Sequence, residues 1–365
     1  MRITAARSRH RHPLMDPQGQ VLHFIGADLA SLACGLVLAD QRLGGRAEIP
    51  VLDLSGEKWL EHNPSQLPEG LLRSYAAVPY ALGLWQQLEP RLEAWIDLLQ
   101  LQAMEPLLIP PLPGVDMLLR CLCLAEALER SPALTVLLPA PAEALALLEL
   151  ARTGPALVET LLEPLLLWWD QTRQSLASLE IVLRLRLPPS TSLRLDALWR
   201  ARLERMAELL APAGPWQLSL ALECADPEAR LLRQRLSCAA LRGFLPSRLG
   251  LHGPAADGLL TTRPPWWPQE LVGAALGHGT DVVALQAFLQ AVVPADRHLV
   301  DAAAGTWRLP MAGVNKSELD VRQVGTMLVL ISGGQRRLLD LPAALQKRQC
   351  SAARLENGWL ELRFS

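Results

Sequence analysis

The chain has 365 residues, 50% of them apolar, which is enough for two domains or for one large domain with an appended module. Its formal net charge of −2 argues against a general nucleic-acid-binding protein, because such proteins carry a basic surface. Six scattered cysteines, among which only Cys121 and Cys123 are close in sequence, do not supply the ligands of a zinc site. They are typical of reduced thiols, which indicate a cytoplasmic location. From the cysteine spacing we expect no metal, and from the net charge we expect no nucleic-acid partner.

The most apolar part of the chain, residues 133–169, does not have the pattern of a membrane span. Prolines and glutamates interrupt it, whereas a span needs about 20 largely uncharged residues. Residues 1–20 are basic and lack the apolar run of a secretory signal. We expect a short disordered tail there, with a transit-type peptide as the alternative, and at most peripheral contact with a membrane.

After the tail, buried strands alternate with helices. Short apolar runs that end in turn residues predict strands at 21–26, 48–56 and 133–141. Helical periodicity predicts helices at 29–42, 71–101 and 115–130. Further along, we predict a strand at 180–190, a helix at 192–210 and a strand, turn and helix from residue 215. This alternation predicts a mostly parallel α/β sheet with helices on both faces.

Residues 143–169 form a leucine-dense helical region in which apolar side chains nearly encircle the helix. Such a helix is either buried or offers a hydrophobic face to a partner. A buried helix pair is our first interpretation, and a surface for hydrophobic protein segments is the alternative. The candidate binding residues share this region; they are Leu157, Leu161, Leu162, Leu165, Trp168 and Trp169.

The pattern changes near residue 301. From Thr306 to Ser365, short alternating segments are separated by glycine turns. The sequence Glu356–Gly358, flanked by apolar alternation, is the strongest local hairpin signal in the chain. We therefore predict a separate antiparallel β-sandwich over residues 301–365.

The stretch VLHFIGADLASLACGLVLAD, residues 21–40, has the strand, glycine and helix order of a phosphate-binding loop. In the spacing G-x-x-x-x-G-K-[ST] started at Gly26, the second glycine falls on Ser31, the cation on Leu32 and the Mg²⁺-binding hydroxyl on Ala33. Without these partners a triphosphate would lose its hydration uncompensated. The strand-end Asp53 is more typical of a turn than of a magnesium ligand. The sequence thus predicts the outline of a nucleotide site without its chemistry.

The last 50 residues resemble a domain of a known family. The segments GGQRRLLDLPAAL (333–345) and ARLENGWLELRF (353–364) are similar to the small-heat-shock-protein-like β-sandwich of some ArsA-type ATPases, the arsenite-pump and tail-anchored-protein-targeting family. The order of the upstream elements is similar to the same family, and Asp226 and Pro227 stand where it has an Asp-Pro pair. By this resemblance its first loop glycine corresponds to Gly26 and its signature lysine to Ala27.

The resemblance implies a P-loop-NTPase-like, ArsA-like α/β domain over residues 21–300, in which the catalytic residues of the family are absent. We expect a degenerate member without a nucleotide or other cofactor: a non-hydrolysing pseudo-ATPase that acts as a chaperone-like or scaffold protein and binds hydrophobic protein segments. The alternative is a divergent ATPase with unusual nucleotide-binding residues. A third hypothesis is a scaffold subunit whose apolar helices form a homodimer.

Overall fold

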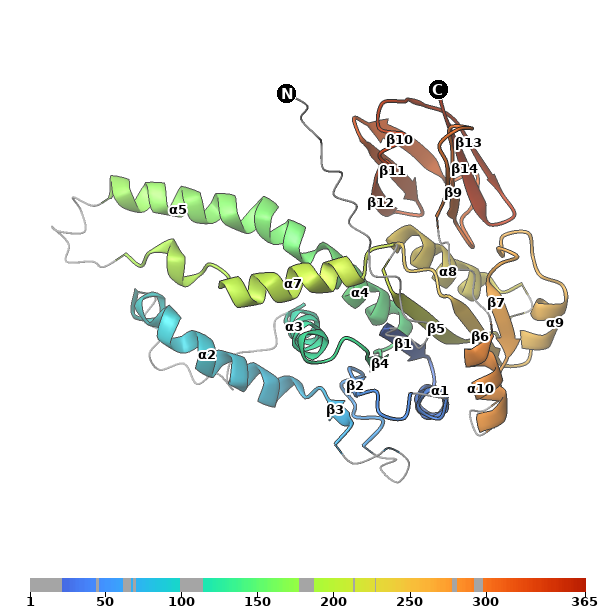
Figure 1. Cartoon of the computed structure of the whole chain (residues 1–365), viewed down its shortest axis with the longest axis horizontal. Helices are drawn as coiled ribbons and strands as arrows, with labels where there is room; N and C mark the ends of the chain where they lie inside the picture. Colours follow the sequence, from blue (N-terminus) through green and yellow to red (C-terminus); the bar gives the residue numbers. More distant parts are fainter. Residues whose placement is uncertain are drawn as a thin grey trace, which may run out of the picture.

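The computed structural model (Figure 1) describes residues 22–43, 46–61, 67, 70–98, 114–176, 187–212, 214–226, 228–277, 281–291 and 298–365. The tail predicted at 1–20 and residues 180–186 of the predicted strand lie outside this range. The rest of that strand prediction is wrong, because residues 187–189 have no regular structure and Ser190–Ser192 form the short helix η4.

A seven-stranded sheet forms the centre of the larger domain. Its order is β3-β2-β4-β1-β5-β6-β7, and every described pair is parallel. The chain places β2 and β3 on one side of β1 and later inserts β4 between β1 and β2, whereas β5, β6 and β7 follow in order on the other side, as in doubly wound folds. The α/β prediction is confirmed. The strands are β1 Leu22–Ala27, β2 Val51–Asp53, β3 Leu72–Ser74, β4 Thr135–Leu137, β5 Trp216–Glu223, β6 Arg248–His252 and β7 Val272–Ala275.

Helices cover both faces of the sheet because its central strands are apolar on both sides. On one face, α1 and α10 pack around Leu36 and Phe288. On the other, α3, α4, α7 and α8 enclose a larger core that includes Leu124 and Leu148. The helices of these two layers are α1 Ala30–Gln41, α3 Val115–Arg130, α4 Pro141–Leu157, α7 Ala197–Leu209, α8 Arg230–Arg242, α9 Ala256–Thr261 and α10 Val282–Gln290.

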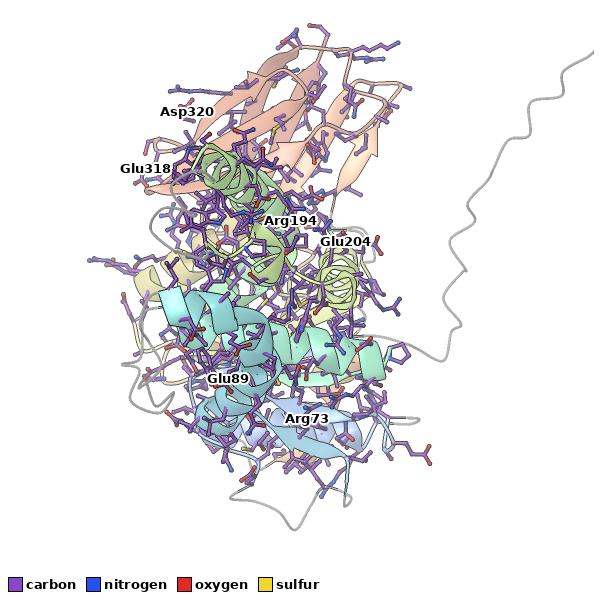
Figure 2. All side chains as sticks on the ribbon, turned by 90° about the vertical axis from the view of Figure 1, so that its left-hand side faces the viewer. Arg73, Glu89, Arg194, Glu204, Glu318 and Asp320 are labelled. Carbon is purple, nitrogen blue, oxygen red and sulfur yellow. The ribbon has the colours of Figure 1, made fainter. Side chains whose placement is uncertain are left out.

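A helical arm extends from the sheet on the side of α2, α5 and α7 (Figure 1). It contains α2 (Ala77–Leu98) and α5 (Glu163–Ser175), joined where the rings of Trp95 and Trp169 lie 5.0 Å apart between centroids. Trp95 Nε1 also donates to Ser192 Oγ at 2.8 Å. From the end of the arm, Glu89 on α2 and Glu204 on α7 are seen among the packed helices (Figure 2).

The C-terminal residues fold into two antiparallel sheets, β10-β11-β12 and β13-β14-β9-β8. Their shared core includes Leu328 and Leu360 and also takes in Ala240 and Leu241 of α8, so the sandwich is docked on the larger domain. The predicted hairpin is confirmed: Asn357 and Gly358 both have positive φ, as a two-residue turn requires. The strands are β8 Leu299–Asp301, β9 Thr306–Pro310, β10 Asp320–Val324, β11 Met327–Ser332, β12 Gln335–Asp340, β13 Cys350–Glu356 and β14 Trp359–Phe364.

Two predictions about the helices need correction. The helix expected at 71–101 begins with a strand, β3, whose three residues pair with β2. The prolines expected to interrupt residues 143–169 do not break the chain into separate helices. Instead α4 runs through Pro155 into a π-helical turn, η3 (Val158–Leu162), and on into α5. The wide turn lets Glu163 N–H donate to Val158 O, and Pro164 then lies at the start of α5, where its missing N–H costs little.

Candidate functional site

The loop with the outline of a phosphate site lies at the carboxyl end of the central strand β1. Gly26 and Ala27 belong to the strand itself, and α1 begins at Ala30. A Cβ at Gly26 would lie 2.9 Å from Leu220 Cδ2, so this glycine allows β1 to pack closely against the neighbouring strand. Its φ is not positive, and it makes no loop of the kind that turns several N–H groups toward an anion.

The other residues of this loop point in different directions. Ala27, Leu32 and Ala33 are fully buried in the core between the sheet and α1. Ser31 is exposed at the start of the helix. The structure therefore brings three of the five degenerate-loop positions into hydrophobic packing, where neither a lysine nor a magnesium-binding hydroxyl is present.

Asp28 lies directly after β1, at the edge where a phosphate would approach the helix. Its Oδ1 is 2.6 Å from His252 Nε2, and its Oδ2 accepts from Arg235 Nη1 at 3.1 Å and from the backbone N–H of Glu223 at 2.6 Å. These donors come from α8, from the end of β5 and from the end of β6. A carboxylate of the chain itself thus takes the cationic and backbone donors that a bound anion would use.

The charge of this carboxylate is stabilised where it lies. Burial raises the pKa of Asp28. The hydrogen bonds from His252, the Glu223 N–H and Arg235, together with the electrostatic attraction of His252, outweigh burial and lower the pKa below its ordinary value. Asp28 is therefore ionised at neutral pH. A second anion at this edge would meet a fixed negative charge whose partners are already engaged.

Other residues at the carboxyl edge of the sheet serve the fold. Asp53 is buried after β2, where its carboxylate accepts from the N–H groups of Ser55 at 2.9 Å and of Leu60 at 3.2 Å, so it is a turn residue. An open pocket of about 910 Å³ lies beyond β5 and β6. No cation is among its lining residues, so it does not supply what a phosphate needs; they are Ala225, Pro254, Ala255, Gly258, Leu259, Thr261 and Thr262.

Toward the amino ends of β1 and β5, away from the carboxyl edge, the fold brings together three polar side chains that the sequence spacing did not reveal. Ser219 Oγ is 2.9 Å from His23 Nε2, and His23 Nδ1 is 2.8 Å from Asp40 Oδ1. These are the distances of a Ser-His-Asp triad. Asp40 also accepts from Thr135 Oγ1 at 2.6 Å and pairs with Arg46 Nε at 3.1 Å. The three residues come from β1, α1 and β5, so only the fold could place them together.

This constellation is sealed. Ser219, His23 and Asp40 are all buried between the sheet and its helices. Burial raises the pKa of Asp40, but the attraction and hydrogen bond of His23, then Arg46 and Thr135, lower it to about 2. A nucleophile needs an approach path and an oxyanion site, and this serine hydroxyl has no exposed surface. The group is a satisfied polar network that ties β1, α1, β4 and β5 together.

The leucine-dense region forms an exposed apolar stripe, which we define as Leu157, Leu161, Leu165 and Trp168. Spacings of four, four and three residues place them on one side of the α4–η3–α5 helix. Leu161, Leu165 and Trp168 are 64%, 57% and 58% exposed. Our first interpretation, a buried helix pair, is therefore wrong for these residues, because the helix carries apolar side chains all round while the arm covers only one side of it.

The remaining predicted residues of this region face the arm. Trp169 is half-buried, and its indole N–H donates to Pro188 O at 2.9 Å while its ring packs on Trp95. Leu162 is also half-buried, and Leu166, which the prediction did not include, is buried. Leu167 is exposed at 54% and was missed too.

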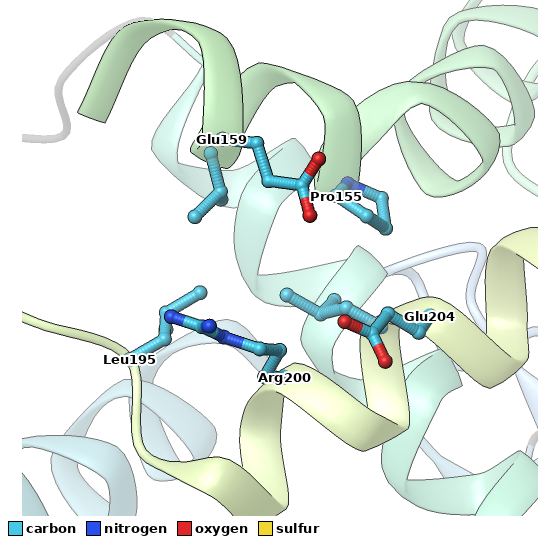
Figure 3. Close-up of a pocket in the computed structure, with 7 residues that line it drawn as sticks. Pro155, Glu159, Leu195, Arg200 and Glu204 are labelled. Atoms are coloured by element: carbon cyan, nitrogen blue, oxygen red, sulfur yellow. The ribbon is translucent and has the colours of Figure 1, made fainter. Parts of the chain in front are cut away.

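A small cleft lies between α4–η3 and α7 (Figure 3). Its wall is apolar, with Pro155 and Leu195 among the contributors. Glu159 reaches toward it from one side, and Arg200 and Glu204 do so from α7. Arg200 also donates to Glu163 at 2.9 Å. This charged rim around an apolar wall was not predicted, because its two sides are some 40 residues apart in sequence.

Three findings limit the chemistry and location of the site. In the described part of the chain, no group of three or more His, Cys, Asp or Glu side chains is placed to hold a metal ion. All six cysteines are free thiols. Among the helices that the structure describes, none is both long and apolar enough to cross a bilayer.

Comparison with known proteins supports the reading of the C-terminal module. Residues 304–364 match the family described as an HSP20-like domain found in ArsA. The resemblance proposed for this module from its sequence is confirmed. Over a longer span, an uncharacterized protein of Streptomyces coelicolor, SCO2128, is 28% identical across 309 residues, which cover 76% of this chain and 77% of that protein. The chain thus carries an ArsA-related C-terminal domain behind a parallel α/β domain.

Proposed function

We propose that the protein is an ArsA-related pseudo-ATPase that binds exposed hydrophobic segments of other proteins without hydrolysing nucleotide. The observation that carries the proposal is the exposed apolar stripe of α4–η3–α5. Isolated exposed leucines are common on protein surfaces, but aligned large apolar side chains on one helix face are typical of a binding surface.

The shape of the arm suits an amphipathic helical or extended segment. The stripe spans residues 157–168, about three helical turns, so a partner segment can lie along it. A partner helix that presents apolar residues at matching spacing would bury the stripe, while Glu159 and Arg200 at the cleft rim remain at the polar margin.

The lack of nucleotide chemistry supports the pseudo-ATPase half of the proposal. Leu32 and Ala33 are packed in the core, and Asp28 already engages His252 and Arg235. Accommodating a triphosphate would require breaking this network and desolvating charge against a carboxylate. Binding of a client is therefore expected to be independent of ATP.

Capture of an immobilised hydrophobic helical peptide tests the binding half. We expect the double substitution Leu161→Asp and Trp168→Asp to weaken capture at least tenfold, because both side chains lie in the stripe and leave the fold's core untouched. Leu231→Asp is the matched control, since Leu231 is 54% exposed on α8, away from the arm. Equal binding by all three proteins would refute the proposal.

Two further measurements separate the alternatives. Isothermal titration with Mg-ATP tests the divergent ATPase, and micromolar affinity would overturn the pseudo-ATPase assignment. Size exclusion with light scattering tests the scaffold: if the wild type is a stable dimer and Leu161→Asp with Trp168→Asp makes it a monomer, the stripe is a subunit interface rather than a client site.

A further inference from the structure

Two arginines converge where the C-terminal sandwich meets the larger domain. Arg337 of β12 donates from Nη1 to Ala240 O at 2.7 Å, and Arg152 of α4 donates from Nη2 to Arg242 O at 2.5 Å. Both contacts are made at the carboxyl end of α8, next to Gly243. The point where a Cβ of Gly243 would lie is 2.8 Å from Arg152 Nη1 and 3.1 Å from Arg337 Nη2. The two guanidinium groups therefore face the same small region.

Neither of these two cations has an ion pair of its own with a carboxylate of the described chain. Arg337 is only 5% exposed, and the ion pairs of the described residues include neither it nor Arg152. The nearby carboxylate of Glu149 attracts Arg152 but forms its ion pair with Arg242, at 3.1 Å. The carbonyl end of α8 offers about half a negative charge, which leaves more than one positive charge uncompensated.

Buried donors are left over at the same place. Arg337 Nε and Arg242 Nε are buried and have no hydrogen-bond partner among the described residues. The two converging nitrogens of Arg152 and Arg337 are no more than about 6 Å apart, close enough for like charges to repel. Burial, and then repulsion from Arg152, lower the pKa of Arg337 to about 9, so it remains cationic at neutral pH. A buried repulsive pair with spare donors is costly unless an anion joins it.

We propose that Arg152 and Arg337, assisted by Arg242, bind a small dianionic oxyanion of the phosphate class between the two domains. Planar guanidinium groups suit such an anion, because they carry several N–H donors in a fixed geometry. Arg337 Nη1 and Nη2 already contact Ala240 O and His298 Nε2, at 2.7 and 3.2 Å, so its Nε–H is the donor left for the anion. Gly243 makes room for this arrangement, since any side chain there would strike Arg152. Access is from the side of Arg152 and Gly243, which are half-buried rather than sealed.

The site joins the domains physically. Arg337 belongs to the sandwich, whereas Arg152 and Arg242 belong to helices of the larger domain. An anion held by all three binds the folded, docked state and not the unfolded chain, so it raises stability in proportion to its occupancy. The neighbouring Arg336, exposed on the opposite face of β12, takes no part.

Thermal unfolding of the full chain in millimolar inorganic phosphate, against sodium chloride of equal ionic strength, tests the proposal. We expect phosphate to raise the wild-type Tm saturably by about 2–4 °C, with the increase lost in Arg337→Gln and in Arg152→Gln. Arg336→Gln, the matched control, should keep the full increase. Millimolar concentrations keep general salt effects on stability small.

Several outcomes would overturn the inference: no difference between phosphate and chloride, an equal increase in Arg152→Gln, or its loss in Arg336→Gln. If Arg337→Gln does not fold, two measurements still test the proposal: the effect of phosphate on the Tm of Arg152→Gln, and equilibrium dialysis of phosphate against the wild type. Phenyl phosphate distinguishes a free oxyanion from a phosphate ester, and weaker binding of the ester supports the former.

Discussion

Replacing Asp28 tests whether the edge of the sheet is held by an internal carboxylate. In Asp28→Ala, the imidazole of His252, the guanidinium of Arg235 and the backbone N–H of Glu223 all lose their acceptor. His252 and the carboxylate are largely shielded from water, so solvent replaces these hydrogen bonds poorly. The substitution should therefore destabilise the larger domain rather than merely alter its surface.

The magnitude follows from the two shorter contacts. A hydrogen bond to a charged group contributes about 1.5–3 kcal/mol, and the 3.1 Å contact with Arg235, which is partly exposed, contributes less. We expect Asp28→Ala to lower the free energy of unfolding by about 3 kcal/mol at pH 7. Because folding depresses the pKa of Asp28, its contribution is present above the unfolded value of about 4 and is lost as pH falls below it. The difference between wild type and variant should shrink in acid.

Urea denaturation at pH 7 and at lower pH measures both effects. The control is Asp226→Ala, which removes a neighbouring half-buried carboxylate whose recorded contact is a turn hydrogen bond to Glu228 N–H, and which should cost less than about 1 kcal/mol. The reasoning fails if Asp28→Ala and Asp226→Ala are equally mild at pH 7. It also fails if the Asp28→Ala deficit persists unchanged well below pH 4.

Two other substitutions test the polar network and the domain contact. Asp40→Asn should cost about 3 kcal/mol at pH 7, because it removes the charge that pairs with the half-buried Arg46 and that accepts a hydrogen bond in the buried contact with His23. With a folded pKa of about 2, the Asp40 contribution is present above about pH 4 and is lost as pH falls from there through 2, which a pH series of denaturant midpoints would show. Gly313→Ala should cost more than about 3 kcal/mol, since φ is +74° and a Cβ would lie 2.2 Å from Arg233 O. Gly325→Ala, with φ of +59° and open space around it, should cost only about 1 kcal/mol; similar midpoints for the two glycine variants would contradict a rigid contact between sandwich and α8.

The parts of the fold that could be predicted were those coded by local pattern. The helix at 115–130 was predicted to the residue, because Gly114 and Ser131 bound an amphipathic run. The hairpin around Asn357 was equally clear, since only a few residue types favour positive φ. Strand β3 was absorbed into a helix because its three residues are stabilised by pairing with β2, which is information that its own sequence does not contain.

The candidate site was less predictable for the same reason. The missing lysine and hydroxyl of the loop were visible in the sequence, but the role of Asp28 depends on His252, which is 224 residues away. Ser219 and His23 are separated by 196 residues, so no spacing rule could pair them. The apolar character of residues 157–168 was evident, whereas its exposure depended on how the arm packs around α2.

An ATP-driven targeting protein must couple two features, nucleotide binding and exposure of its client surface, and in this structure the two are separate. In such a protein, nucleotide acts on a client surface only if it binds one conformation more tightly than the other. Here the donors at the sheet edge are occupied by Asp28 in the same structure in which the stripe around Leu161 and Trp168 is already exposed. On the proposed function, in which the stripe binds clients, we therefore expect client affinity to be the same with and without Mg-ATP. A change of more than threefold on adding Mg-ATP would show that the coupling survives through other residues.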